Sequence, residues 1–150
     1  MVRLEVVEMG KPDKSSVDAL AKYAAVSDSG QRTILENVLA RAFDMVQRTA
    51  DVALLEGRWR IQADDHRGEV KVYMGGKVQS VTDGDGSAVL FNQRGRKVYV
   101  GTDEYVEVVF TTEVNASDYN SLLPVVLRYA TALYDGKDTR ELNSILKECL

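Results

Sequence analysis

The segment Arg58-Trp59-Arg60-Ile61-Gln62 marks a change in the pattern of the sequence. Charged or polar residues alternate there with apolar ones, which is the period expected for a β-strand with one buried face. Similar short strand segments follow at residues 69–73, 77–81, 88–91, 97–100 and 105–111. Asp83-Gly84-Asp85-Gly86 is a strong hairpin-turn signal between two of them. We therefore expect five or six short antiparallel strands in meander order over about residues 58–113.

The apolar residues before this region recur at three- and four-residue steps, which is the helical period. They are Ile34, Leu35, Val38, Leu39, Ala42, Met45, Val46, Thr49 and Ala53. We expect one long amphipathic helix over about residues 29–54. Its outer face should carry the surface pairs Arg32/Glu36 and Asp44/Arg48, which are spaced four residues apart.

A shorter helix is expected before the long one. Ser15 and Ser16 offer hydroxyl caps for it. It should stop near Val26, because residues 27–30 (Ser-Asp-Ser-Gly) form a turn cluster. Residues 2–9 precede this helix and are open to two interpretations, an extra strand or an arm that reaches a neighbouring copy.

Helical spacing returns in the last third of the chain. Ser117 or Asp118 can cap a helix whose first turn tolerates Pro124. Asp138-Thr139 should then cap a final short helix. Together these C-terminal helices should cover about residues 119–148.

Length and composition indicate one α+β domain over residues 1–150, with helices at both ends and strands between. Hydrophobic residues make up 45% of the chain and charged residues 28%, which excludes a disordered protein. The longest apolar stretch, residues 122–127, is far too short to cross a membrane, and charges interrupt the N-terminus too often for a signal peptide. A single cysteine, Cys149, cannot form an internal disulfide and is compatible with a reducing cytosol.

The sequence offers few residues for catalysis or metal binding, and we predict no catalytic, cofactor or metal site. His66 is the only histidine and lies in a polar turn. An acid–base or metal-binding role is one interpretation of this residue, and an ordinary solvated turn is the other. Residues 83–86 resemble the opening of a calcium loop, but Arg94 occupies the twelfth position, where such a loop needs glutamate. An Asp-Gly turn is therefore favoured. Cys149 lies too close to the terminus for a positioned nucleophile. An enzyme would depend on carboxylates such as Asp64, Asp65, Asp103 and Glu104.

Charge is unevenly distributed along the chain, whose formal net charge is -4. Lys and Arg exceed Asp and Glu only in the middle, over residues 58–101. Arg94, Arg96 and Lys97 form a small basic tip there, which is typical of a solvated turn or of a contact to an acidic partner. It lacks the stacking aromatics and the extended basic surface that nucleic-acid binding usually needs.

The order of these elements resembles the head-to-tail connector, or adaptor, family of tailed bacteriophages, which also occurs in prophages and gene-transfer particles. The resemblance covers about residues 16–141. Members of that family often have a proline just before the Val-x-Ser-Val strand, where this chain has Gly76-Lys77. The residues that carry the resemblance are Asp18-Ala19-Leu20, the stripe from Ile34 to Ala53, Trp59, Val78-Gln79-Ser80-Val81-Thr82, residues 105–111 and Ala130-Thr131-Ala132-Leu133-Tyr134.

The resemblance implies a structural role in the neck of a virion made in the host bacterial cytoplasm. Such proteins form a ring of about twelve copies beneath the portal protein. The ring extends the channel for the packaged DNA, without sequence-specific binding, and presents a surface to a stopper or tail-completion protein. No catalysis, cofactor or membrane is implied.

The resemblance also implies which segments contact partners. Residues 135–150 would dock on the portal, and hairpin tips at residues 83–86 and 93–97 would face neighbouring copies or the channel. Residues 2–9 precede the usual start of that family, and we expect residues 1–15 to form an N-terminal arm. The candidate partner-binding residues are Asp135, Lys137, Arg140, Leu142, Ile145 and Leu146, together with Arg94, Arg96 and Lys97.

Two other classes of function stay open at this point. One is a small ligand-binding or regulatory α+β domain, which predicts a concave pocket between the long helix and the sheet. The other is an enzyme that uses the turn around His66, for which the substitution His66→Ala should abolish an activity without unfolding the protein.

Overall fold

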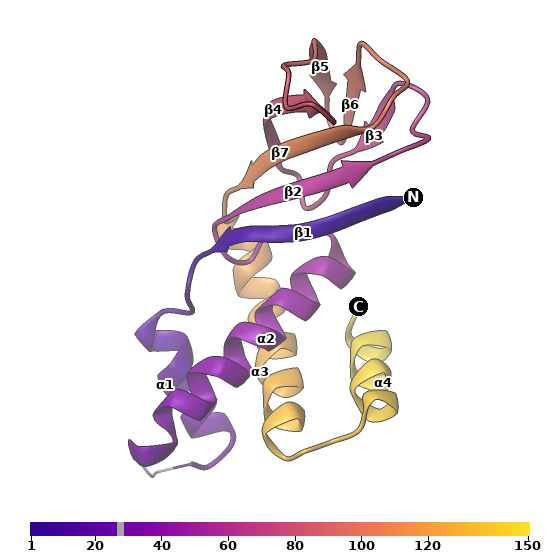
Figure 1. Cartoon of the computed structure of the whole chain (residues 1–150). Helices are drawn as coiled ribbons and strands as arrows, with labels where there is room; N and C mark the ends of the chain where they lie inside the picture. Colours follow the sequence, from indigo (N-terminus) through magenta and orange to yellow (C-terminus); the bar gives the residue numbers. More distant parts are fainter. Residues whose placement is uncertain (27–28) are drawn as a thin grey trace. The chain divides into compact units, whose positions relative to one another are not determined.

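The computed structural model describes residues 1–26 and 29–150 (Figure 1). It confirms the α+β class, with helices toward both ends and antiparallel strands between them. Contacts divide the chain into two compact units. The strand unit comprises residues 1–10 and 51–114, and the helix unit comprises residues 11–50 and 115–150. That the two form one adaptor-like domain stays a prediction.

The strand unit contains two antiparallel sheets rather than one meander. The larger sheet has the order β1-β2-β7-β4, and the smaller one has the order β3-β6-β5. The bounds are β1 Val2–Met9, β2 Gly57–Ala63, β3 Glu69–Lys71, β4 Lys77–Asp83, β5 Phe91–Arg94, β6 Lys97–Val100 and β7 Val106–Thr112. The expected meander order is therefore wrong, because the alternation of a strand specifies its buried face but not its partner.

Strand β1 settles the question left open for residues 2–9. It pairs antiparallel with β2, from Val2 opposite Ala63 to Met9 opposite Gly57. The extra strand is therefore the correct one of the two interpretations, and the predicted arm of residues 1–15 includes an edge strand of the larger sheet. The helix period of residues 34–53 cannot reveal a strand so far upstream.

The core of the strand unit is built around Trp59, which is fully buried. Its ring stacks on Phe110 of β7 at a centroid distance of 6.4 Å, and its Nε1 donates to Thr112 Oγ1 at 3.3 Å. Gly76 lies against the same cluster, since a Cβ there would be only 2.2 Å from Phe110 Cδ2. This close approach explains why glycine occupies the position at which the resembling family often has proline.

The predicted turn at residues 83–86 is present. Asp83 Oδ1 accepts hydrogen bonds from the backbone N–H groups of Asp85 and Ser87, both at 2.9 Å. The chain reverses, and Val89 N donates to Val81 O at 2.9 Å. The returning segment does not continue along β4, however, because β5 begins at Phe91 and belongs to the other sheet.

The helix unit begins with α1 (Lys14–Tyr23). Its N-cap is Asp13, whose carboxylate accepts from Ser16 N at 2.8 Å, and not Ser15 or Ser16 as predicted. The helix ends three residues before the predicted stop at Val26. Residues 27 and 28 of the predicted turn cluster lie outside the described residues.

The long helix is shorter than predicted. A 3-10 turn, η1 (Ser29–Gln31), precedes α2 (Arg32–Ala50). Asp51 ends the helix because its φ of +56° is left-handed. The surface pairs Arg32–Glu36 and Arg48–Asp44 are confirmed at 3.7 and 2.9 Å. Leu35, Leu39, Ala42 and Val46 of the predicted apolar stripe are buried as expected, together with Phe43 and Gln47. Three residues of the stripe, Ile34, Met45 and Thr49, are exposed.

The last two helices are α3 (Ala116–Tyr134) and α4 (Thr139–Cys149). Asn115 caps α3 by accepting from Asp118 N at 3.1 Å, so neither predicted cap is used. Because α3 starts earlier than expected, Pro124 lies well inside it and not in its first turn. Asp138 caps α4 as predicted, with Glu141 N donating to its carboxylate at 2.9 Å. No helix in the described part of the chain is long and apolar enough to cross a membrane.

Candidate functional site

The turn around His66 is held by both nitrogens of the imidazole. Gly68 N donates to Nδ1 at 2.9 Å, and Nε2 bonds to the carbonyl oxygen of Glu104. A carbonyl can only accept, so the ring carries its proton on Nε2. The ring thereby ties its own turn to the loop before β7. This arrangement is structural, and acid–base chemistry at His66 would have to break one of the two contacts.

Neither hydrogen bond of the His66 ring involves one of the carboxylate groups considered for an enzyme. Asp64 forms an ion pair with the N-terminal ammonium of Met1, whose hydrogen bond lowers the pKa of the Asp64 carboxyl. Glu104 is bonded through its backbone, with its N–H donating to Thr102 Oγ1 at 3.1 Å. Over residues 1–26 and 29–150, no group of three or more histidine, cysteine or acidic side chains is placed to hold a metal ion.

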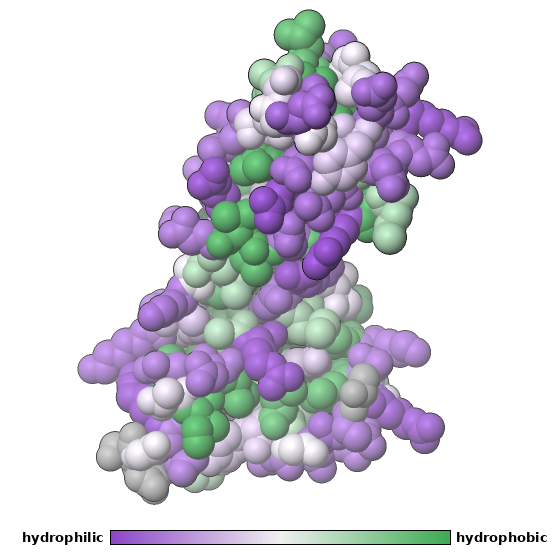
Figure 2. All heavy atoms as spheres, viewed as in Figure 1, coloured by the Kyte–Doolittle hydropathy of each residue, from purple (hydrophilic) through white to green (hydrophobic). Residues whose placement is uncertain are grey.

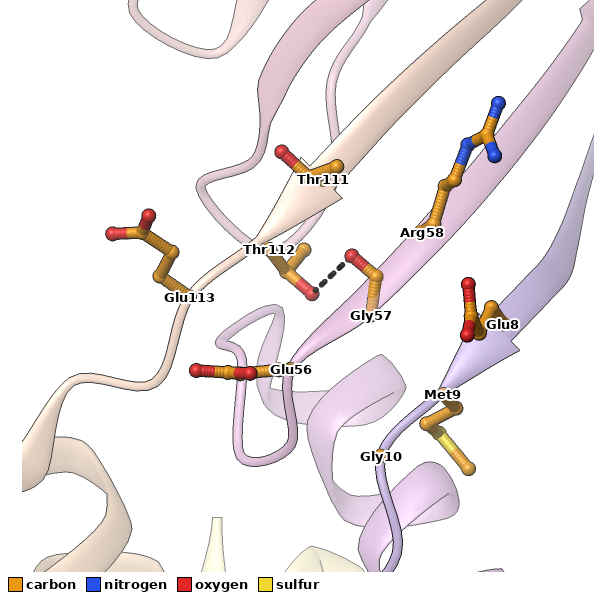
Figure 3. A pocket seen from close by; sticks show the side chains of 9 residues that line it. All are labelled: Glu8, Met9, Gly10, Glu56, Gly57, Arg58, Thr111, Thr112 and Glu113. Atoms are coloured by element: carbon orange, nitrogen blue, oxygen red, sulfur yellow. Dashed lines mark hydrogen bonds between the residues drawn. The ribbon is translucent and has the colours of Figure 1, made fainter.

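A cleft of about 470 Å³ opens where β1 ends, β2 begins and β7 ends (Figure 3). Glu8, Glu56 and Glu113 line it together with a single cation, Arg58, so its charge favours a positively charged group. Figure 3 shows the Arg58 side chain pointing away from Glu56 and Glu113. The remaining lining residues are Met9, Gly10, Gly57, Thr111 and Thr112.

The cleft lies within the strand unit, and none of its lining residues comes from α2. It is therefore not the pocket that a ligand-binding domain was expected to have between the long helix and the sheet. Its floor is closed by Thr112, which is buried and donates through Oγ1 to Gly57 O at 3.5 Å. No local pattern could have predicted this cleft, because its three glutamates come from segments that are far apart in the chain.

Two of the three residues of the predicted basic tip are paired inside the chain. Arg96 Nη1 donates to Asp51 Oδ2 at 2.6 Å, and Lys97 Nζ lies 2.7 Å from Glu69 Oε1. The hydrogen bond to Glu69 raises the pKa of Lys97. Arg94 is exposed and has no ion pair among the described residues. It is thus the one member of the tip whose charge is uncompensated there.

Asp51, at the start of the second segment of the strand unit, makes further contacts within that unit. Its carboxylate also accepts from Met74 N at 2.6 Å and lies 3.4 Å from Lys71 Nζ. Asp51, whose backbone is left-handed, thus ends α2, and its carboxylate contacts three donor groups. The sequence prediction missed it because it placed the helix end at about residue 54.

Some residues of the predicted portal-binding segment are buried against the rest of the helix unit, and others are exposed. Leu142 and Leu146 are buried and Ile145 is half-buried, since α4 packs on α3. Lys137 Nζ lies 3.7 Å from Glu141 Oε2. The residues of this segment that remain exposed include Asp135, at the C-terminal end of α3, and Arg140.

Cys149 is better positioned than its place in the sequence suggests. It is the last residue of α4, and Arg128 Nη1 of α3 donates to its Sγ at 3.3 Å. Arg128 Nη2 also donates to Glu148 Oε2 at 2.9 Å. These bonds join the end of α4 to α3.

The strand unit exposes apolar side chains that the sequence interpretation did not single out. Leu90 is 88% exposed, and Phe91 and Tyr99 are about 40% exposed beside it. In Figure 2, hydrophobic atoms project at the top of the view, where β5 lies in Figure 1. A second group lies on β1 and consists of Val2, Val6 and Val7. Such exposure is typical of surfaces that meet another molecule.

Comparisons with known proteins relate the chain to particle necks through its fold. No protein-family model and no curated protein matches the sequence. The chain is similar to a chain in "Neck of empty GTA particle computed with C6 symmetry", with a TM-score of 0.60 and 17% identity over 89% of this chain and 84% of that chain. It is also similar to one in "Virion of native gene transfer agent (GTA) particle", with a TM-score of 0.56 and 14% identity over 97% and 94% of the two chains. At these identities the likeness shows a shared fold.

Proposed function

We propose that this chain is a structural protein of the neck of a phage-like particle, where it acts as a head-to-tail adaptor. The observation that carries the proposal is the shared fold with a chain from a gene transfer agent neck, which extends over most of both chains. After β1, the order of two helices, strands and two helices resembles the adaptor family independently of that comparison. The geometry of the His66 turn and of the acidic cleft supplies no competing catalytic arrangement.

The adaptor forms a closed ring beneath the portal and extends the DNA channel toward the tail. The similar neck was computed with C6 symmetry, and a ring of twelve copies contains that symmetry. Twelve chains of 16.6 kDa have a mass of about 199 kDa. The net charge of -4 per chain suits a channel through which DNA slides without adhering, because DNA binding depends on neutralising phosphates with cations.

The C-terminal segment of residues 135–150 is the proposed contact with the portal. Its leucines hold α4 against α3, so the contact depends on its exposed charges, in particular Asp135 and Arg140. Deleting the segment would uncover the apolar face of α3 and is a poor test. The substitution Arg140→Glu is a better one, with Lys14→Glu on α1 as a matched charge reversal at an exposed site of the same unit.

Removal of the gene from cells that produce the particle tests the proposal. We expect heads that form and package DNA but carry no tails, and complementation with the full chain should restore complete particles. The Lys14→Glu chain should restore them as well, whereas Arg140→Glu should restore fewer. Complete, infective or DNA-transferring particles made without the gene would contradict an adaptor function.

A further inference from the structure

The exposed face of the smaller sheet carries three cations side by side. The register of the sheet places Lys71 of β3 opposite Lys97 of β6, and Lys97 opposite Arg94 of β5. Residues directly opposite in an antiparallel pair point to the same face, and these three are all exposed. The alternate residues Val70 and Val98 are buried on the other face. The cations therefore form a row across all three strands (Figure 1), which we call the basic row, and Lys71 extends the tip that the sequence predicts at residues 94–97.

Like charges directly opposite one another in a sheet repel, so the basic row costs stability unless anions compensate it. Lys97 Nζ has Glu69 Oε1 at 2.7 Å, whereas Arg94 has no ion pair with any residue that the structure describes. Lys71 Nζ lies 3.4 Å from Asp51 Oδ2. That carboxylate is shared with an arginine of the β5–β6 hairpin, which lies 2.6 Å from it. Four cations are thus offset by two carboxylates, which leaves a net charge of +2 here on a chain with a total of -4.

Two neutral hydrogen-bond donors lie beside the basic row on the same face. Asn92 is opposite Tyr99 in the register, and both residues are exposed. Neither side chain is hydrogen-bonded to a residue in the described part of the chain. Asparagine and tyrosine side chains are common donors to the phosphate oxygens of nucleic acids. The face has no aliphatic side chain, since its residues are Glu69, Lys71, Asn92, Arg94, Lys97 and Tyr99.

This composition favours a polyanion over a protein surface as the partner. The core of a protein–protein interface is depleted in charged residues, lysine among them. Interfaces with nucleic acids are instead polar and strongly positive. The spacing agrees, because strands about 4.8 Å apart give the basic row a span of about 10 Å. One strand of B-DNA advances about 3.4 Å per phosphate, so about three phosphates lie along that length.

We propose that the basic row binds the phosphate backbone of double-stranded DNA without reading its sequence. Lys71, Lys97 and Arg94 neutralise phosphates, and Asn92 and Tyr99 donate hydrogen bonds to backbone oxygens. Because only about three phosphates are bound, the contact is weak and easily broken by salt, which suits DNA that moves past the chain. The inference deepens the proposed function and rests on it only for the source of the DNA.

Binding of a short labelled DNA duplex of mixed sequence to the full-length chain, followed by fluorescence anisotropy, tests the proposal. Three neutralised phosphates predict a slope of about -2.7 for the logarithm of the binding constant against that of the salt concentration. The affinity should therefore fall about fortyfold between about 50 and about 200 mM salt. A second duplex of unrelated sequence should bind equally well. A chain that binds neither duplex at about 50 mM salt overturns the inference.

Single substitutions locate the binding surface. Arg94→Gln should weaken binding about tenfold at about 50 mM salt and reduce the salt slope by about 0.9, whereas Arg94→Lys keeps the charge and should bind nearly as well as the wild type. Arg3→Gln is the matched control, because Arg3 is an exposed arginine on β1 without an ion pair among the described residues. The urea midpoint of Arg94→Gln should not fall, since the substitution relieves a like-charge pair. Equal affinities of Arg94→Gln and Arg3→Gln would place the contact elsewhere and overturn the proposal.

Competition with polyglutamate tests for the other class of partner, an acidic protein surface. Polyglutamate that displaces the labelled duplex as well as unlabelled DNA does, at equal concentration of charges, shows that the row recognises acidic polypeptides and contradicts the proposal. The outcomes also separate this inference from the proposed function. Failure to bind DNA overturns the inference alone, because the adaptor proposal depends on the shared fold. Complete particles made without the gene contradict the adaptor proposal and leave the measured binding of DNA as it is.

Discussion

Replacing Gly76 with alanine should destabilise the strand unit, although glycine-to-alanine changes often stabilise proteins. The new Cβ would lie 2.2 Å from Phe110 Cδ2 and 3.1 Å from the backbone oxygen of Thr111. An ordinary contact is 3.4 Å or more, so the Phe110 ring would have to move by about 1.2 Å. Phe110 is fully buried and stacked on Trp59, so a movement of its ring would also disturb Trp59.

The magnitude follows from two opposing effects. Overpacking a core of this kind costs about 1–3 kcal/mol, and the clash with a backbone oxygen places Gly76→Ala in the upper part of that range. Reduced freedom of the unfolded chain offsets this by about 0.4–1 kcal/mol. We therefore expect a net loss of about 2 kcal/mol in the free energy of unfolding. The matched variant Gly84→Ala meets no atom closer than 3.7 Å, so only the effect on the unfolded chain applies, and its free energy of unfolding should stay the same or rise by up to about 1 kcal/mol.

Urea unfolding followed by tryptophan fluorescence measures this difference directly. Trp59 is the only tryptophan and lies in the same cluster, so its emission reports on the strand unit. With a slope near 2 kcal/mol per molar urea, the midpoint of Gly76→Ala should fall by about 1 M. Equal midpoints for Gly76→Ala and Gly84→Ala would refute the packing described around Phe110.

Three further predictions concern groups that tie loops together or are buried. Asp51→Ala should lower the free energy of unfolding by about 2 kcal/mol, because Met74 N–H loses its acceptor and two cations lose their counter-charge. Asp51→Asn keeps an acceptor and should lower it less in the same urea assay. His66→Ala should lower stability by about 1 kcal/mol without changing the wild-type mass of the assembly, and a variant that folds normally but no longer assembles would contradict a purely structural role. Burial raises the pKa of Tyr119 and Tyr129, so their contribution to stability is present below the ordinary pKa of tyrosine and is lost as the pH rises through the raised values. Tyr129→Phe should remove part of the stability loss above about pH 10, and an unchanged alkaline transition in urea titrations would count against this.

The sequence predicted the strands and helices closely because their signals are local. Alternation in Arg58–Gln62 identifies β2 to within a residue or two, and the Asp83–Gly86 turn occurs where its residues require it. The pairing of β2 with β1 and β7 could not be predicted, since both partners are more than 40 residues away. The helix ends were predicted less accurately, because several neighbouring side chains can cap the same helix. In α1 the cap is Asp13 and not Ser15.

For the candidate sites too, local sequence patterns identified residues, but only the folded chain shows their partners. Arg94, Arg96 and Lys97 were identified as a basic tip, but only the folded chain shows that Asp51 and Glu69 neutralise two of them. Helical spacing in the C-terminal segment marked apolar residues without saying whether they face a partner or α3. The two exposed patches of the strand unit consist of ordinary strand residues, and exposure of a valine or leucine is a property of the fold that no sequence pattern contains.

The mass of the assembled protein tests the central claim most directly. The full-length chain should be measured by native mass spectrometry alone and then mixed with the portal protein encoded by the same genome. We predict either a closed assembly of about 199 kDa, corresponding to twelve 16.6-kDa chains, or a stable complex with the portal that contains the same number of copies. A chain that remains a 16.6-kDa monomer at every concentration and does not bind the portal would contradict the adaptor account.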